Sequence, residues 1–563
     1  MCCNASAHVA ALSRYLGLKV RGWGINCHSV PEVYFDGAWH LFDSSLINYF
    51  PKSDGKIAGV EEIIAGVKEW NEKHPEFKTL KGKPLNDALY KFMKELPPEW
   101  KSGPKGWSRG PDVLLRSPTM NENGWHPNKT HGWYSTMQEY DGSTAFPYEY
   151  SPTPGYEVNI QLRLGEKLTR NWSNKGLHVN MDGAGGAPGC LTIKSLDDAL
   201  WWGQSGNLAP GRVGNGSLEY TVPLAGGEFK NGALAVENLA ATADDKAAPA
   251  LHLADAAKPG ELILRMPSSY VYLSGEISLQ SVMGDGGEIA IAFSDNNGLD
   301  WKDVTKISTS GAQTVDLKPF VFRHYDYRLK FTLKGKGTGI DALKIVHDIQ
   351  HSQRPLPALT QGENTLSFDA GAAEGTITVD GNFGKHDPKQ RNYTDLHPQS
   401  EAMNGGQPTG ADGSITFPIE TPGDMTRLRM SAGVRNFDDS SSWDLQASFD
   451  DGKTFKTIGQ VAPAKAGNST YAVLSEIPNG TRKALVRFVG HKKGDTILLA
   501  FRADADYKEP NSGFAPIKIT YIWEEDGKEK QDVHVARKPS ETWTIKCDAK
   551  PAMKSIVIER SNE

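Results

Sequence analysis

The stretches that decide the fold of this 563-residue chain are IAIAFSDNNGLDW, residues 289–301, and LQASFDDGKTF, residues 445–455. Each begins with alternating apolar residues, which is the period of a half-buried β-strand. Each then continues with the same pattern, Ser-x-Asp/Asn-x-Gly-x-x-aromatic. The Asp or Asn can cap turn amides with its side chain, and the Gly can take a positive φ. The pattern predicts a strand followed by a tight turn whose aromatic residue packs back onto the sheet.

This turn resembles the Asp-box of sialidase-type and related β domains, and we interpret it as a folding device rather than a sialidase site. A propeller would repeat the turn once per blade, about every 40–50 residues. Here Ser294 and Ser448 are 154 residues apart. That spacing predicts two β-sandwich domains with one copy of the turn in each.

The rest of the chain from about residue 156 onward also favours short strands, because brief apolar alternations are separated by Gly, Asn and Asp turns. The first expected strand is Val158–Leu164, in which apolar and polar residues alternate cleanly. Asp526-Gly527 predicts a hairpin near the C-terminus. A last strand pair is expected at 541–547 and 554–559.

The composition agrees with turn-rich β domains, since the chain has 58 Gly, 33 Pro and 14 Trp. Its net charge of −6 comes from 62 basic and 68 acidic residues, with no long charge run. Nucleic acid is therefore not indicated as a partner. No apolar run approaches the roughly 20 residues that span a bilayer, and five cysteines are too few for a disulfide framework.

The first fifty residues differ from the rest because they carry a helix signal. Residues 3–16 have apolar side chains at spacings of three and four, and Gly17 follows where a left-handed C-cap is expected. Cys3 would then lie in the first turn. The positive end of the helix dipole favours a thiolate there, so the sulfur would be nucleophilic near neutral pH.

A hairpin is predicted next, because PEVYFDGAWHLF, residues 31–42, has an Asp-Gly turn signal at its centre. With that turn, the register continues outward until Val30 faces Asp43. His28 is two residues before Val30, so it projects from the same face as Asp43, with Cβ atoms about 6–8 Å apart. A carboxylate at that place can accept an imidazole N–H and orient the ring.

This segment resembles the transglutaminase-like core of the papain-like cysteine enzymes. The matching positions are Cys3 and Ala7, Leu16-Gly17-Leu18, His28, Glu32-Val33-Tyr34, Asp36-Gly37, Trp39 and Asp43. The match covers only about a tenth of the chain but is specific within it. The family usually carries Gly-x before the Cys and has further helices and strands upstream. We therefore expect the core to be N-terminally incomplete.

The resemblance implies a Cys-His-Asp triad that acts on amide bonds. Cys3 would attack the carbonyl carbon, His28 would act as general base and then acid, and Asp43 would orient His28. The substrate would be a peptide bond or a Gln carboxamide, with hydrolysis and acyl transfer both open. Cys2 is the alternative nucleophile, and Cys27 is interpreted as a packing thiol. The alternative function is a non-catalytic surface or glycan-binding protein with a degenerate core.

No metal or cofactor is expected, because the Cys/His cluster lacks the Cys-x-x-Cys knuckle of structural zinc sites. The expected partner is a protein or peptide substrate, with cell-surface polysaccharide as a further candidate. No signal peptide is evident in this chain. The turn-rich β architecture leads us to expect an extracytoplasmic or secreted protein.

We therefore predict a multidomain chain, α+β and then mostly β, in which a partial transglutaminase-like core precedes two or more β-sandwich domains. The expected divisions are 1–55 for the core, 56–155 for a helical and aromatic-rich loop extension, 156–225 for a small β region, 226–354 and 358–510 for sandwiches that each carry an Asp-box-like turn, and 511–563 for C-terminal β hairpins.

Overall fold

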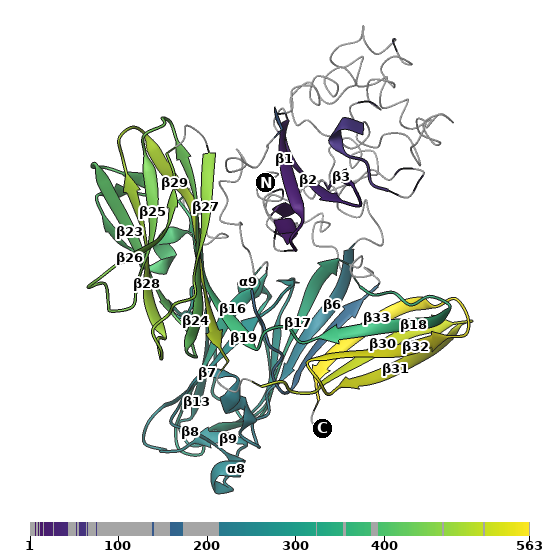
Figure 1. Cartoon of the computed structure of the whole chain (residues 1–563). Helices are drawn as coiled ribbons and strands as arrows, with labels where there is room; N and C mark the ends of the chain where they lie inside the picture. The colour runs from purple at the N-terminus through teal and green to yellow at the C-terminus, as the bar shows by residue number, and fades with distance from the viewer. Residues whose placement is uncertain are drawn as a thin grey trace.

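The computed structural model of the chain is dominated by β-sheets (Figure 1). The residues that it describes are 6, 9–10, 12–14, 16–25, 28–42, 52, 54, 56–62, 65, 75, 138–139, 158–172, 213–322, 324–352, 356–383, 392–463, 467–509 and 513–561.

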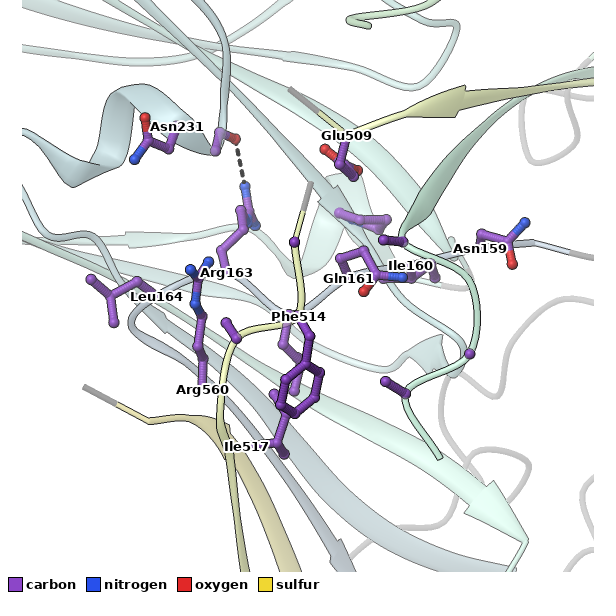
Figure 2. A pocket seen from close by; sticks show the side chains of 18 of the residues that line it. Asn159, Ile160, Gln161, Arg163, Leu164, Asn231, Glu509, Phe514, Ile517 and Arg560 are labelled. Atoms are coloured by element: carbon purple, nitrogen blue, oxygen red, sulfur yellow. Dashed lines mark hydrogen bonds between the residues drawn. The ribbon is translucent and has the colours of Figure 1, made fainter. Parts of the chain in front are cut away.

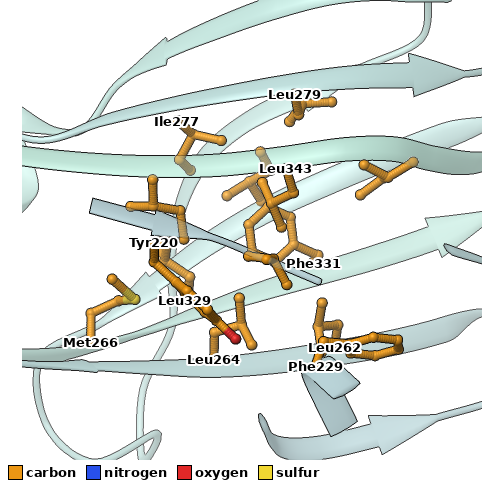
Figure 3. Close-up of a cluster of buried hydrophobic side chains, with 14 of the residues drawn as sticks. Tyr220, Phe229, Leu262, Leu264, Met266, Ile277, Leu279, Leu329, Phe331 and Leu343 are labelled. Carbon is orange, nitrogen blue, oxygen red and sulfur yellow. The ribbon is translucent and has the colours of Figure 1, made fainter. Parts of the chain in front are cut away.

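The first sandwich consists of two facing sheets within residues 213–352. One sheet has the strand order β14-β13-β16-β10-β7, and the other begins β15-β12-β17-β6. Their inward side chains meet in one buried cluster that includes Tyr220, Phe229, Leu264 and Phe331 (Figure 3). The strands are β6 Val213–Thr221, β7 Ala233–Glu237, β8 Leu239–Ala241, β9 Leu251–Leu253, β10 Gly260–Pro267, β11 Val271–Tyr272, β12 Glu276–Val282, β13 Glu288–Ser294, β14 Lys302–Ile307, β15 Gly311–Asp316, β16 Asp326–Lys334 and β17 Gly339–Ser352, and the short helices are η2 Glu228–Asn231, α8 Thr242–Asp245 and α9 Lys318–Val321.

The second sandwich is built in the same way within residues 374–508. Its sheets have the orders β26-β25-β28-β23-β20 and β27-β24-β29-β19. Its core includes Trp443, Phe417, Phe488 and Phe501. The elements are β19 Glu374–Asn382, η3 Tyr393–Leu396, β20 Gln399–Glu401, β21 Met403–Asn404, β22 Gln407–Pro408, β23 Asp412–Glu420, β24 Met425–Asn436, β25 Ser442–Ser448, β26 Lys456–Val461, β27 Gly467–Leu474, β28 Lys483–His491 and β29 Thr496–Lys508.

The two sandwiches have the same strand topology, since β14-β13-β16-β10-β7 corresponds to β26-β25-β28-β23-β20 and β15-β12-β17-β6 corresponds to β27-β24-β29-β19. β13 and β25 have the same alternation of buried and half-buried residues, and so do β14 and β26. The register shifts at the same place in both hairpins, after Ile291 in one and after Leu445 in the other. The repeated sequence stretches therefore lie at equivalent positions, one in each sandwich. The prediction of a multidomain, β-sandwich protein is confirmed at this level.

A C-terminal body completes this part of the chain. It comprises β5 Glu166–Asn171, β18 Gly362–Asp369, β30 Ile517–Glu525, β31 Lys528–Ala536, β32 Ser540–Cys547 and β33 Ala552–Arg560. β5 pairs with both β6 and β33, so one sheet runs from the first sandwich into this body. β18 pairs with β32 and covers a core that includes Trp523 and Ile545.

The strands that we expected at 541–547 and 554–559 exist, but the prediction that they pair with each other is wrong. β32 pairs with β18, and β33 pairs with β30 and β5. β18 lies more than 150 residues before β32, β5 lies more than 350 residues before β33, and β31 and β32 stand between β30 and β33, so local turn signals do not identify these partners. The pairing of β18 with β32 also joins segments that the expected domain divisions placed apart.

The expected strand Val158–Leu164 is also wrong, since residues 158–163 have no regular structure and β5 begins only at Glu166. The backbone N–H and C=O of Asn159 bond instead to Thr376 at the edge of the second sandwich. Consecutive residues 159–164, apolar and polar alike, line a cavity between the β bodies rather than one face of a sheet. Residues 158–164 are all half-buried, so the apolar alternation of the sequence does not correspond to alternating burial.

The N-terminal sheet has the order β3-β2-β1-β4, with β1 Lys19–Ile25, β2 His28–Phe35, β3 Ala38–Leu41 and β4 Gln138–Glu139. Across the described residues, no helix is long and apolar enough to cross a membrane.

Candidate functional site

The helix expected to carry the nucleophile ends as predicted. Residues 6, 9–10 and 12–14 are helical, and Gly17 has a φ of 74°. The N–H of Gly17 bonds to the carbonyl of Arg14 at 2.9 Å, and the N–H of Leu18 bonds to that of Ser13 at 2.8 Å. These two bonds form a Schellman motif, which only a residue tolerant of positive φ completes easily.

Among the described residues of this helix, the buried ones are small. Ser6, Ala10 and Ser13 are buried, whereas Leu12 is 53% exposed and Leu16 is 69% exposed. The larger apolar side chains Leu12 and Leu16 therefore lie on the outer face. Spacings of three and four predicted the helix but did not identify the buried face.

The predicted hairpin register is confirmed. Asp36 and Gly37 have φ values of 49° and 77°, as a two-residue turn requires. β2 pairs with β3 through Tyr34 and Trp39, and the ladder continues to Glu32 and Leu41. The N–H of Phe42 then bonds to the carbonyl of Pro31 at 3.2 Å. The expected pair of Val30 with Asp43 lies beyond this ladder, because Asp43 is outside the described residues.

The described residues contain only part of the expected triad. His28 begins β2 and pairs with Ile25 of β1. Cys3 and Asp43, and the alternative thiols Cys2 and Cys27, lie outside the described residues. The structure therefore describes the strand that carries His28 and its pairing with β3 as far as Leu41, and the triad stays a prediction.

Glu32, which matches the family pattern after the His, is a buried anchor of the hairpin. Its side chain has no exposed surface and pairs with Arg21 of β1. It also accepts a hydrogen bond from the N–H of Val60. The Arg21 guanidinium in turn stacks 4.3 Å from the Trp39 ring centroid. This carboxylate holds the segment at residues 59–60 against the sheet, so its role here is structural.

A second feature is a cavity of about 520 Å³ where the first sandwich, the second sandwich and the C-terminal body meet (Figure 2). We call it the junction cavity. It is lined by residues of all these bodies and by the segment 159–164, which crosses between them. Gln161 holds that segment in place, since its amide nitrogen bonds to the carbonyl oxygens of Ala372 at 2.7 Å and Glu374 at 3.3 Å.

Arg163 and Arg265, which line the junction cavity, are structural cations with their own partners. Arg163 bonds to Glu166 through both its backbone N–H and its guanidinium. Burial opposes its charge, but attraction from Glu166 outweighs burial and holds the pKa of Arg163 above its ordinary value. Arg265 pairs with Asp326 and donates to the carbonyl of Thr376 at 2.6 Å, which ties the first sandwich to the second.

The first Asp-box-like turn has the predicted hydrogen bonds. The N–H of Gly298 donates to Ser294 Oγ at 2.9 Å, and the N–H of Asp300 donates to Asn296 Oδ1 at 3.0 Å. Gly298 has a φ of 83°. In the second turn Gly452 donates to Ser448 at 3.0 Å.

The aromatic residue of each turn packs beneath a cation of the neighbouring strand. Lys330 Nζ lies 4.5 Å from the Trp301 ring centroid, and the Arg487 guanidinium carbon lies 3.5 Å from that of Phe455. These contacts fit the interpretation that the turn is a folding device.

The first turn also forms an interface, which sequence reasoning did not predict. Asn296 Nδ2 donates to the carbonyl of Asp395 at 2.8 Å, and Asn297 Nδ2 donates to that of Thr378 at 2.8 Å. Both carbonyls belong to the second sandwich. The only sequence signal was that Asn296 stands where the second turn has Asp450.

Comparisons with known proteins find no matching family model and no matching curated protein. Some solved structures are weakly similar. Latent PorU from Porphyromonas gingivalis is 9% identical over 53% of this chain and 32% of its own, with a TM-score of 0.20. Allantoicase from Saccharomyces cerevisiae is 12% identical over 44% and 77%, with a TM-score of 0.16. PNGF-II is 9% identical over 46% and 60%, also at 0.16. This chain spans about a third of the PorU chain, and TM-scores this low carry no functional argument.

Across the described residues, no group of three or more His, Cys, Asp or Glu side chains is arranged to hold a metal ion. The residues around the junction cavity were missed by sequence reasoning, because they come from segments hundreds of residues apart. The clean alternation at 158–164 was their one signal, and it was interpreted as a strand.

Proposed function

We propose that this chain is a transglutaminase-like cysteine enzyme that acts on amide bonds. Cys3 is the nucleophile, His28 the general base and acid, and Asp43 the group that orients His28. The observation that carries the proposal is the β2–β3 register around Asp36-Gly37, which is described as far as Glu32 and Leu41. Continued beyond the described ladder, that register would bring Asp43 opposite Val30. His28 is two residues from Val30 on the same strand, so register and family pattern agree independently.

The proposed chemistry is acyl transfer through a thioester. The Cys3 sulfur, deprotonated by His28, bonds to the carbonyl carbon of a peptide or Gln carboxamide. The C–N bond then breaks, and the amine or ammonia leaves with the proton from His28. Water or a second amine attacks the thioester and releases the sulfur. The buried Glu32–Arg21 pair supports this site by holding β1 and β2 together.

The test is the pH dependence of alkylation of Cys3 by iodoacetamide in the full chain, with Cys3 and Cys2 resolved by peptide mass spectrometry. The expected apparent pKa of Cys3 lies well below the ordinary value of about 8.5. Because the imidazolium stabilises the thiolate, His28→Ala should raise it. Cys2→Ser is the matched control, and it should leave the reactivity of Cys3 unchanged.

A Cys3 that titrates at the ordinary value and is indifferent to His28→Ala would refute the triad. If Cys2 instead carries the lowered pKa, the nucleophile is misassigned. Hydrolysis and transfer are then separated by offering a Gln peptide with and without a primary amine, since an amine-linked product forms only in transfer.

A further inference from the structure

The junction cavity contains a cation that lacks a partner. Arg560, at the end of β33, is half-buried and lines the cavity beside its strand partner Ile517 (Figure 2). Among the residues that the structure describes, its guanidinium has no hydrogen bond or ion pair. The cavity's other arginines, Arg163 and Arg265, are both paired with carboxylates. A half-buried guanidinium without a counter-ion favours an anionic ligand, ideally a planar carboxylate.

An amide in the cavity wall is also unsatisfied. Asn159 Nδ2 is buried and has no hydrogen-bond partner in the described structure. Most buried side-chain polar atoms are bonded, so an orphan donor in a cavity wall points to a missing acceptor. The backbone of Asn159 is fixed by its two bonds to Thr376, so the position of the side chain is constrained.

The cavity also offers an acceptor. The hydroxyl of Tyr507 donates to Glu509 Oε1 at 3.0 Å. Glu509 Oε2 makes no bond to another described residue and remains available to a ligand hydroxyl. Burial raises the pKa of Tyr507 to about 12, so its hydroxyl remains a donor at neutral pH and keeps Glu509 in place.

The remaining walls are apolar. They include Leu162, Leu164 and Leu234, and also Phe368 and Phe514, whose ring centroids are 6.3 Å apart and which come from the C-terminal body. Pockets of this size usually hold a small molecule between apolar walls, with a few polar groups to fix its orientation.

We propose that the junction cavity binds an acidic sugar unit, a saccharide ring that carries a carboxylate. The carboxylate pairs with Arg560, ring hydroxyls meet Asn159 and Glu509, and the apolar ring face packs on Phe514. Hydroxyls both donate and accept, so one ring serves the orphan donor and the free acceptor together. The lining carboxylates Glu228 and Asp369 are exposed and therefore screened by water, so they oppose the bound acid weakly.

Such a ligand would touch both sandwiches and the C-terminal body, so it would stabilise their contact. This site is independent of the proposed cysteine chemistry. It relates instead to glycan binding, which is the alternative function inferred from the sequence. An experiment can therefore refute the sugar site without refuting the cysteine enzyme, and the reverse.

The test uses glucuronate at millimolar concentration, with ligand-observed NMR and thermal unfolding of the full chain as readouts. We expect saturable binding and an unfolding temperature that rises with glucuronate concentration. Arg560→Ala should weaken binding about ten- to hundredfold, which is the range for loss of a charge-assisted hydrogen bond. Glu509→Gln should weaken it less, because the amide oxygen still accepts from Tyr507. Lys528→Ala, which removes an exposed cation outside the cavity, is the matched control and should have no effect.

Glucose, acetate and N-acetylleucine distinguish the alternatives. If glucose binds as tightly as glucuronate, the carboxylate does not contribute to binding. If acetate binds as tightly as glucuronate, the sugar ring does not contribute. Tighter binding of N-acetylleucine would reassign the cavity to peptides. Each of these results, or unchanged binding in Arg560→Ala, overturns the proposal. Cys3→Ser should leave glucuronate binding intact, which separates this result from that of the enzyme test.

Discussion

Exchanging the residues that differ between the two repeated turns tests how the sandwiches are joined. Asn296 is only 3% exposed, and its amide nitrogen donates to Asp300 Oδ2 at 2.9 Å and to the carbonyl of Asp395 at 2.8 Å. Asn296→Asp keeps the oxygen that accepts from the turn but replaces both donors with an acceptor. The new carboxylate oxygen then faces Asp300 Oδ2 and the carbonyl oxygen of Asp395, neither of which can donate a hydrogen bond to it. Loss of two hydrogen bonds and burial of an unsatisfied charge should cost about 3 to 5 kcal/mol.

The reciprocal change, Asp450→Asn, is the matched control. Asp450 Oδ1 accepts from the N–H of Thr454 at 2.9 Å and from Ser448 Oγ at 2.8 Å, and an amide oxygen accepts both bonds equally well. Only the bond from the Thr454 hydroxyl to Oδ2 is disturbed. We therefore expect a much smaller loss of stability from Asp450→Asn.

The assay is hydrogen exchange of the full chain, followed by mass spectrometry on peptides that cover 288–307, 374–382 and 442–461. A chain of several bodies does not unfold in a single two-state step, so local opening free energies are the appropriate quantity. Asn296→Asp should lower protection at 288–307 and also at 374–382, the second-sandwich strand that contacts the turn. Equal losses for the two exchanges would show that the interface bond of Asn296 contributes nothing.

The remaining predictions concern charged groups. Burial opposes the charge on His491, but hydrogen bonds to Asp412 and Asp444 outweigh burial and raise its pKa. Its stabilisation is therefore present below the ordinary pKa of about 6.5 and lost as pH rises through the folded value. His491→Gln should reduce the urea midpoint more at pH 5.5 than at pH 8.5, and a constant difference would contradict this. Glu32→Gln should destabilise the N-terminal sheet by about 3 to 5 kcal/mol, because it strips the counter-ion from a buried cation, and hydrogen exchange of residues 19–41 measures this. Arg265→Met should cost less, about 2 to 4 kcal/mol, because its partner Asp326 is 31% exposed. Unchanged exchange at 374–382 in this variant would refute the link between the sandwiches.

Local turn chemistry explains which parts of the fold were predictable from the sequence. Asp36-Gly37 and Asp526-Gly527 each form the expected hairpin, because a two-residue turn with positive φ fixes the register of both flanking strands. The Asp-box-like turns were predictable for the same reason, since their hydrogen bonds lie within about seven residues. Gly17 likewise ended its helix where the pattern placed it.

The missed features depend on contacts between distant segments. The pairing of β18 with β32 joins strands about 180 residues apart, and nothing in either strand identifies the other. Val158–Leu164 shows the same limit, because its alternation predicted a strand, whereas residues 158–164 are all half-buried and residues 158–163 have no regular structure. The segment is held by contacts with Thr376, Ala372 and Glu374, which are more than 200 residues away, so its own sequence could not identify its environment.

At one position the two repeated turns differ by a single side-chain atom, because Asn296 has an amide nitrogen where Asp450 has a second carboxylate oxygen. This difference decides whether the turn can be covered by a carbonyl of another domain. In the second sandwich Asp450 lies at the surface, and bonds from Thr454 and Ser448 hold its pKa at about 2, so it remains charged. In the first sandwich the equivalent Asn296 faces the carbonyl of Asp395, which only a donor can satisfy. A carboxylate would be repelled there, whereas an amide would work at either place. The amide is therefore required only in the turn that is covered. The same reasoning applies to the junction cavity, where the amide of Asn159 is buried but has no acceptor among the described residues. Asn296 marks an interface that is already filled, and Asn159 marks a position where an acceptor from a ligand would complete the structure.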